Sequence, residues 1–251
     1  MKAESHLHCR RAVLVAAAAF LPLAYSVAWS AQNEPASRQS ATSTSASSTE
    51  DKHDAATHLK EAEQVVRQMN ADPGLKDLMG RAKGLFIVPT YGRGALVVGA
   101  QGGPGVLVVH KDDKWSGPAF YNFGGISIGA QAGAAAGKIA MLLMSERAVN
   151  TFAVGNKFSF NADAGFTLVN YSARMQATPG KEDVILWSDT TGLFANASVG
   201  VTDINWDEKE TRAFYGRSVT AKEIIDGKVK SPKAQALLQA LPGKSAATAT
   251  R

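Results

Sequence analysis

The stretch GLFIVPTYGRGALVVGAQGGPGVLVVH, residues 84–110, decides the fold class. It holds three short runs rich in β-branched residues, and the turns between them carry glycine and proline. These runs are 84–89, 94–100 and 105–110. Such runs predict three β-strands in an antiparallel meander. Of the 23 glycines in the chain, 13 lie between Gly84 and Gly137. Glycine inside strands marks bends and bulges, so we expect these strands to curl.

The strand pattern continues along the chain. Further strands are predicted at 118–123, 157–161, 166–175, 183–188 and 192–206. Leu193, Ala195, Ala197 and Val199 alternate with Phe194, Asn196, Ser198 and Gly200, which is the period of a strand with two different faces.

Helices are predicted on both sides of the strands. Before them, Leu59, Val66 and Met69 recur at helical spacing, and Asp72 followed by Pro73 has the composition of a helix start. After them, Thr220 with Glu223 forms a capping box, and a further helix opens at Ser231-Pro232. The predicted fold class is therefore α+β: an antiparallel, glycine-rich β-barrel or sandwich flanked by an N-terminal helical hairpin and C-terminal helices.

The N-terminus has the order of a secretory signal peptide. Residues 10–31, RRAVLVAAAAFLPLAYSVAWSA, run from two arginines through an apolar stretch to small residues. We predict a signal peptide at 1–30, a disordered Ser/Thr/Ala-rich linker at 31–56, a folded domain at 57–242 and a flexible tail at 243–251. Export would place the mature protein in the periplasm of a bacterium. Cys9 is the sole cysteine, which excludes an internal disulfide.

Charge and motifs argue against several function classes. The formal net charge of +5 falls to about +3 without residues 1–30, too little for a nucleic-acid binder. The GxSxG pattern around Ser127 lacks a histidine after it, because the last histidine is His110. The stretch from Gly133 to Lys138 departs from a phosphate-binding loop at two positions. The carboxylate pairs Asp112-Asp113 and Asp207-Glu208 fall in predicted turns. We therefore predict no catalytic residue, cofactor or metal.

One alternative concerns residues 124–144. Gly125, Gly129, Gly133 and Gly137 are spaced by four, and on a helix they would line one face, as in membrane-spanning helix pairs. Lys138 inside this stretch and the strand patterns around it favour strands instead.

Several motifs together resemble the SYLF domain, a lipid-binding module, over residues 57–241. The most specific are Trp115-Ser116-Gly117-Pro118, the Gly125-x-Ser127-x-Gly129-x-Gln131-x-Gly133 string, Gly192-Leu193-Phe194 and Tyr215-Gly216. The resemblance implies reversible, peripheral binding to anionic, phosphoinositide-like lipid head groups through the N-terminal amphipathic helices and nearby basic side chains.

The residues predicted to bind lipid are basic side chains of the helical hairpin and of the glycine-rich turns. They are Lys60, Arg67, Lys76, Arg81, Lys83, Arg93, Lys111 and Lys114. Two interpretations of the hairpin remain open: its helices cap a core with their lysines in solvent, or they lie on a membrane. The competing function is a structural envelope protein that acts through protein contacts, with 124–144 inserted in the membrane.

Overall fold

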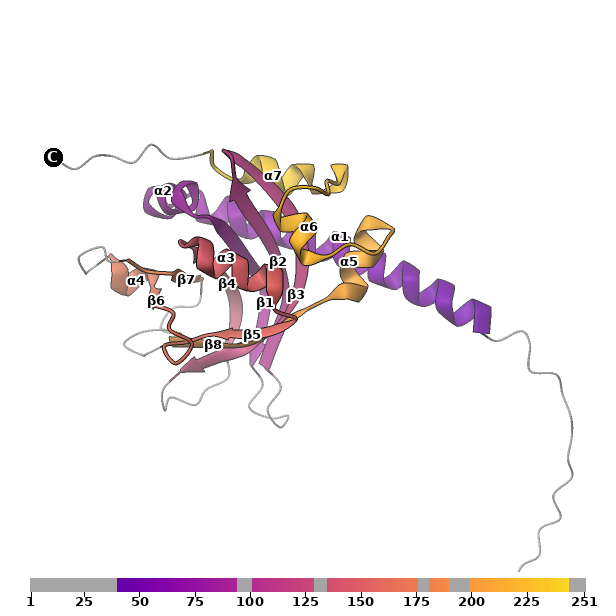
Figure 1. Cartoon of the computed structure of the whole chain (residues 1–251), viewed down its shortest axis with the longest axis horizontal. Coiled ribbons are helices and arrows are strands. Elements are labelled where there is room, and N and C mark those ends of the chain that lie inside the picture. Colours follow the sequence, from indigo (N-terminus) through magenta and orange to yellow (C-terminus); the bar gives the residue numbers. More distant parts are fainter. Residues whose placement is uncertain (1–39, 94–100, 129–134, 176–180, 190–198, 244–251) are drawn as a thin grey trace, which may run out of the picture. The chain divides into compact units, whose positions relative to one another are not determined.

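A computed structural model describes residues 40–93, 101–128, 135–175, 181–189 and 199–243. Its centre is one sheet of eight strands in the order β5-β8-β3-β2-β1-β4-β7-β6. The strands are β1 Gly84–Arg93, β2 Gln101–Lys111, β3 Lys114–Ile128, β4 Ala135–Leu143, β5 Lys157–Phe160, β6 Leu168–Asn170, β7 Val184–Ser188 and β8 Val199–Trp206. Neighbours are antiparallel except β6 and β7. The sheet curls into a half-barrel (Figure 1), which confirms the α+β class.

Two helices, α2 and α6, begin at the caps that the sequence predicts. They are α1 Ser40–Met69, α2 Pro73–Arg81, α3 Glu146–Val154, α4 Tyr171–Arg174, α5 Glu208–Tyr215, α6 Ala221–Ile225, the 3-10 turn η1 Pro232–Ala234, and α7 Gln235–Ala240. The Asp72 carboxylate accepts from the Gly74 backbone N–H at 2.8 Å, as its position before Pro73 predicted. The capping box of Thr220 and Glu223 is also present.

The two faces of the sheet bury separate cores. Along β1, Leu85 and Ile87 belong to one core, whereas Phe86 and Val88 belong to the other. We call the first the α1 face, because α1, α2, α5 and α7 pack on it. The second is the α3 face, which is covered by α3 and α6. In Figure 1, α3 lies in front of the sheet and α1 behind it.

The glycine-rich strands bend where side chains of the α3 face need room. A Cβ on Gly105 would lie 2.2 Å from the Phe86 ring, so the ring occupies the space of the missing side chain. The register between β1 and β2 shifts between Ile87 and Gly92. The strand predicted at 94–100 lies outside the described residues.

Three predictions need correction. Residues 40–56, predicted to be a disordered linker, belong to helix α1, in which Ala55 is already fully buried in the core of the α1 face. The strand predicted at 166–175 ends at Asn170, because the Asn170 side chain accepts from the Ser172 N–H and starts α4. Asp207, predicted to lie in a turn, caps the unforeseen helix α5.

The helical alternative for 124–144 is also wrong where the structure describes that stretch. Gly125 and Ile139 lie in β3 and β4 and pair with strands β8 and β1. Gly129 and Gly133 lie outside the described residues, as do the leader 1–30, residues 31–39 and the tail from 244. Within the described ranges, no helix combines the length and apolarity that crossing a bilayer requires.

Candidate functional site

Three of the eight predicted basic residues are held in ion pairs. Arg67 pairs with Glu63 and Arg81 pairs with Asp77, in each case one helical turn away. The Lys83 ammonium lies 3.3 Å from the carboxylate of Glu146. These neighbours reduce the positive charge that the three side chains offer to a ligand.

Arg93 lies at the opposite end of β1 from Lys83, which directly precedes that strand. It ends the strand that Gly84 begins, and at about 3.3 Å per residue the two ends are roughly 30 Å apart. The side chain of Arg93 lies outside the described residues.

The four remaining predicted residues line depressions around the C-terminal helix. Three depressions in the described part of the chain are each bordered on one side by η1 or α7. Together they are lined by the lysines Lys52, Lys60, Lys76, Lys111, Lys114, Lys230 and Lys233. We call these three depressions the α7 surface.

The largest depression, the hairpin cleft, holds about 760 Å³ between the turn that joins β2 to β3 and the segment that joins α6 to η1. Lys111, Lys114 and Lys230 line it, and so do Asp112, Asp113 and Asp226. Asp112 and Asp113 form the two-residue turn with φ of 50° and 58°, a conformation that aspartate tolerates better than most residues. The hairpin cleft therefore offers charges of both signs.

Trp115 fixes the wall of the hairpin cleft. Its indole N–H donates to the Pro242 carbonyl at 2.8 Å, and its ring stacks on His110 at a centroid distance of 4.5 Å. The chain beyond α7 is thereby tied to the end of the sheet. The Trp-Ser-Gly-Pro motif at 115–118 thus contributes a structural contact at the α7 surface.

The second depression, the lysine groove, holds about 300 Å³ between α1 and the helices α5, η1 and α7. Lys52 and Lys60 of α1 and Lys233 of η1 line it, above a floor that includes Phe214 and Leu237. The Lys233 ammonium donates to the Phe214 carbonyl at 3.2 Å. The third depression, of about 730 Å³, brings Lys76 of α2 beside Pro242.

Sequence reasoning missed Lys52, Lys230 and Lys233. Lys230 and Lys233 flank the predicted helix start Ser231-Pro232, so a signal was present, but only the folded chain brings them beside Lys60 and Lys111. Lys52 was assigned to the linker, although it lies within α1.

The apolar side of α1 is not free to enter a membrane in this fold. Leu59, Val66 and Met69 are at most 7% exposed and pack on the sheet. Of the two interpretations of the hairpin, the one in which its helices cap a core is therefore confirmed. A lipid surface would meet the basic side chains of α1, rather than its apolar face.

Two polar links hold the helices on opposite faces. On the α1 face, His58 Nδ1 and Glu210 Oε1 are 2.8 Å apart. Burial raises the pKa of the Glu210 carboxyl against the opposing effect of His58. Burial lowers the pKa of His58, but the hydrogen bond and charge of Glu210, with the charges of Glu61 and Asp54, outweigh it and raise the pKa.

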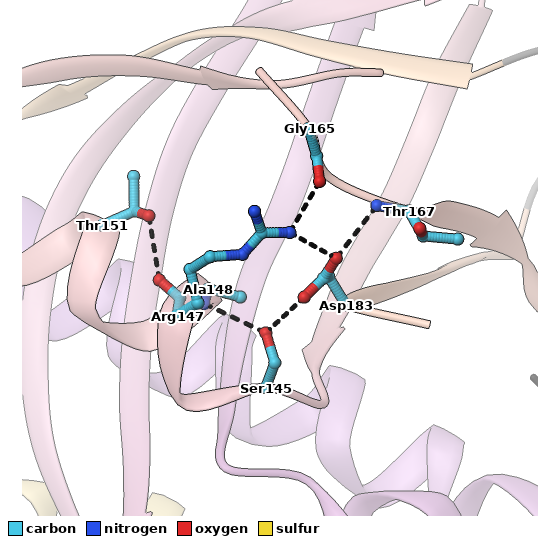
Figure 2. A network of polar contacts seen from close by, with 7 residues as sticks. All are labelled: Ser145, Arg147, Ala148, Thr151, Gly165, Thr167 and Asp183. Atoms are coloured by element: carbon cyan, nitrogen blue, oxygen red, sulfur yellow. Dashed lines mark hydrogen bonds and ion pairs between the residues drawn. The ribbon is translucent and has the colours of Figure 1, made fainter. Parts of the chain in front are cut away.

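On the α3 face, Asp183 is the centre of a network at the start of α3 (Figure 2). Its carboxylate accepts from the Ser145 hydroxyl at 2.7 Å, the Arg147 guanidinium at 2.7 Å and the Thr167 backbone N–H at 3.0 Å. Burial raises the pKa of Asp183, but these three donors outweigh it, and the pKa is lowered. Every member of the network has a structural partner, and no histidine joins it.

The described residues form surface depressions on a rigid sheet and bring together no group of three or more His, Cys, Asp or Glu side chains fit to hold a metal ion. Ser127 stands in β3, and its side chain is outside the described set.

Comparison with known proteins indicates the family of this chain. Residues 124–243 match the family model described as Ysc84, Las17-binding protein actin regulator. The chain is 32% identical to Protein YSC84 of Saccharomyces cerevisiae over 163 residues, which is 62% of this chain and 35% of that protein. It is 27% identical to SH3 domain-containing YSC84-like protein 1 of Homo sapiens over 183 residues, 71% of this chain and 53% of that protein.

The match over residues 124–243 supports the SYLF/Ysc84 family that the quoted motifs predicted. The chain spans between about a third and about half of the length of these curated relatives.

Proposed function

We propose that this protein is a non-enzymatic, exported binding protein that docks reversibly on anionic lipid at the periplasmic side of the cell envelope, through the α7 surface. The observation that carries the proposal is the gathering of seven lysines around one short helix. They come from α1, α2, the turn between β2 and β3, and the segment before α7, which are distant in sequence.

The attachment is electrostatic and weak. Seven lysines line the α7 surface against five carboxylates, which are Glu63, Asp77, Asp112, Asp113 and Asp226. Glu63, Asp77 and Asp226 are in ion pairs with basic side chains outside the linings. Each lysine near an anionic surface contributes about 1 kcal/mol. Salt screens such attraction over about 8 Å at physiological strength, so docking should be reversible and sensitive to salt.

A protein partner is the second candidate function. The family description names protein binding, and so does the name of a second yeast relative, LAS seventeen-binding protein 3. The chain is 30% identical to that relative over 164 residues, which is 63% of this chain and 36% of that protein. The hairpin cleft, with three lysines and three aspartates around Trp115 and Leu238, favours this function. Mixed charge and an aromatic wall suit a polypeptide better than a uniformly anionic surface.

The test is co-sedimentation with vesicles of phosphatidylcholine alone or mixed with phosphatidylglycerol, at low and physiological salt. The protein is taken from the periplasmic fraction, and its N-terminus is sequenced to test export. We expect binding only to the mixed vesicles, weakened by salt. In the variant Lys111→Glu/Lys114→Glu, affinity should fall by about tenfold or more, because each reversal replaces an attraction of about 1 kcal/mol with a repulsion.

The control Lys157→Glu/Lys181→Glu makes the same charge change at exposed positions outside the α7 surface. It should bind more tightly than the first variant. If both variants lost the same factor in affinity for the vesicles, the effect would come from net charge and not from the α7 surface. Absence of binding to every vesicle would overturn lipid docking in favour of the protein partner.

A further inference from the structure

We propose that the lysine groove is a discrete site for the phosphate head group of one anionic phospholipid, with the beginning of its acyl chains on the apolar floor. This inference rests on the proposed docking function. It adds a stoichiometric site to what would otherwise be diffuse attraction between a basic surface and a membrane.

The first argument is the convergence of cations that lack an acidic partner. Lys52, Lys60 and Lys233 are all exposed, and among the described ion pairs none includes them. The acidic side chain in the lining, Glu63, is already paired with Arg67 at 2.7 Å. The groove therefore holds three ammonium groups together without a matching carboxylate, an arrangement that a bound anion stabilises.

The hairpin cleft shows that this imbalance is specific to the groove. There, Lys111, Lys114 and Lys230 share the lining with three aspartates. An anion entering the hairpin cleft would meet carboxylates as well as ammonium groups. Both depressions border helix α7, and they differ in the charged side chains that line them.

The second argument is the floor of the lysine groove. Phe214 is 3% exposed and packs against Phe120 and Tyr215 at centroid distances of 5.3 and 4.9 Å. The Tyr215 hydroxyl donates to the Pro118 carbonyl at 2.8 Å, which fixes this part of α5 against β3. Leu59 and Leu237 complete a rigid apolar floor that needs no ordering when a ligand binds.

A floor beneath a cationic rim is complementary to an amphiphile. Inorganic phosphate would satisfy the ammonium groups alone, whereas a phospholipid would also contact the apolar lining of the groove. The volume of about 300 Å³ is at the lower end of the range for small-ligand sites, which suits one head group with the start of its chains.

The experiment titrates the whole protein with dihexanoyl phosphatidic acid below its micelle concentration, dihexanoyl phosphatidylcholine and inorganic phosphate, followed by calorimetry. Ala236 is exposed and lines the groove, so Ala236→Trp fills it while keeping every charge. Gln235→Trp places the same ring on the other side of α7, in the hairpin cleft, and is the matched control. Lys60→Gln/Lys233→Gln removes two cations and keeps hydrogen-bonding groups.

We expect saturable one-to-one binding of phosphatidic acid, with the other two probes weaker by about tenfold or more. Ala236→Trp and Lys60→Gln/Lys233→Gln should lose a similar factor, while Gln235→Trp binds like the wild type. Urea unfolding of each variant verifies that the fold is intact. Equal affinity for inorganic phosphate, or unchanged binding by Ala236→Trp, would overturn the site.

The vesicle assay separates this inference from the proposed function. Salt-sensitive binding to vesicles without binding of dispersed dihexanoyl phosphatidic acid would overturn the proposed groove site and leave surface docking in place. Monomer binding without vesicle binding would support the groove as a site for a dispersed anionic lipid and overturn docking on a surface.

Discussion

The two faces of the sheet bury similar numbers of apolar side chains by different means. The α3 face is a cluster of aromatic rings, in which Phe152 lies 4.7 to 5.7 Å from Phe86, Tyr121, Phe158 and Phe160. The α1 face is largely aliphatic and is covered by helices that leave depressions between them. Aromatic packing thus stabilises the α3 face, whereas the lysine groove lies between helices of the α1 face.

The polar links follow the same division. Asp183 on the α3 face receives three hydrogen bonds, which hold α3 to the strands beside it. Between α1 and α5, His58 and Glu210 make a polar contact at 2.8 Å. We therefore expect the α3 face to dominate stability and the α1 face to respond more readily to its surroundings.

The largest effect is expected from Phe152→Ala. This ring is fully buried among four others, and its loss leaves a cavity that rigid neighbours cannot fill. The free energy of unfolding should fall by about 3–5 kcal/mol, measured by urea denaturation.

The comparison variant is Val66→Ala on the α1 face, where an equally buried but smaller side chain packs under α1. The loss of two methyl-sized groups should cost about 1.5 kcal/mol. If the two variants were equally destabilised, the α3 face would not be the dominant core.

Sequence reasoning succeeded where a local pattern controls the backbone. Asp72 before Pro73 and Thr220 before Glu223 cap their helices as predicted, because a cap needs only neighbours in sequence. The β-branched runs at 84–89 and 105–110 lie in strands β1 and β2, as predicted. The turn predicted at Asp207 was wrong, because a carboxylate before a polar segment is typical of a helix start as well as of a turn.

The candidate site was predictable only in part. Lys60 and Lys111 stood out as basic residues beside amphipathic or glycine-rich segments, but nothing local tells that Lys233 lies across a groove from Lys60. The i,i+4 spacing of Glu63 with Arg67 and of Asp77 with Arg81 is a sequence signal for the ion pairs that hold these two arginines. Apolar periodicity in α1 is equally suited to a core and to a membrane, and packing on the sheet decides between them.

A smaller effect is expected from Asp183→Asn. The change removes the ion pair with Arg147 and weakens two further hydrogen bonds, at a cost of about 1–3 kcal/mol. The lowered pKa of Asp183 means that its stabilisation is present at pH above its ordinary value of 3.8 and is lost as pH falls towards its folded value. Urea denaturation between pH 7 and about pH 2 should show a shallower acid loss in the variant. Parallel pH profiles would contradict a role for this carboxylate in acid stability.

The smallest effect, with the opposite sign in pH, is expected from His58→Gln. Because the pKa of His58 is raised above 6.5, its contribution is complete below that value and is lost as pH rises through the folded pKa. The raised pKa of Glu210 acts in the same direction, since the folded state then holds its proton more firmly than the unfolded state. Glutamine keeps a hydrogen-bond donor for Glu210, so the loss at acidic pH should be only about 1 kcal/mol.

Hydrogen exchange of the α1 amides at pH 6 and pH 8, corrected for intrinsic rates, measures this local effect. In the wild type, protection of α1 should decrease at the higher pH more than that of the sheet, and in His58→Gln this difference should disappear. A wild-type α1 equally protected at both values would mean that the apolar packing of Leu59, Val66 and Met69 alone holds the helix. The α1 face would then be as insensitive to pH in this range as the aromatic face opposite it, and the lysine groove would keep its shape between pH 6 and pH 8.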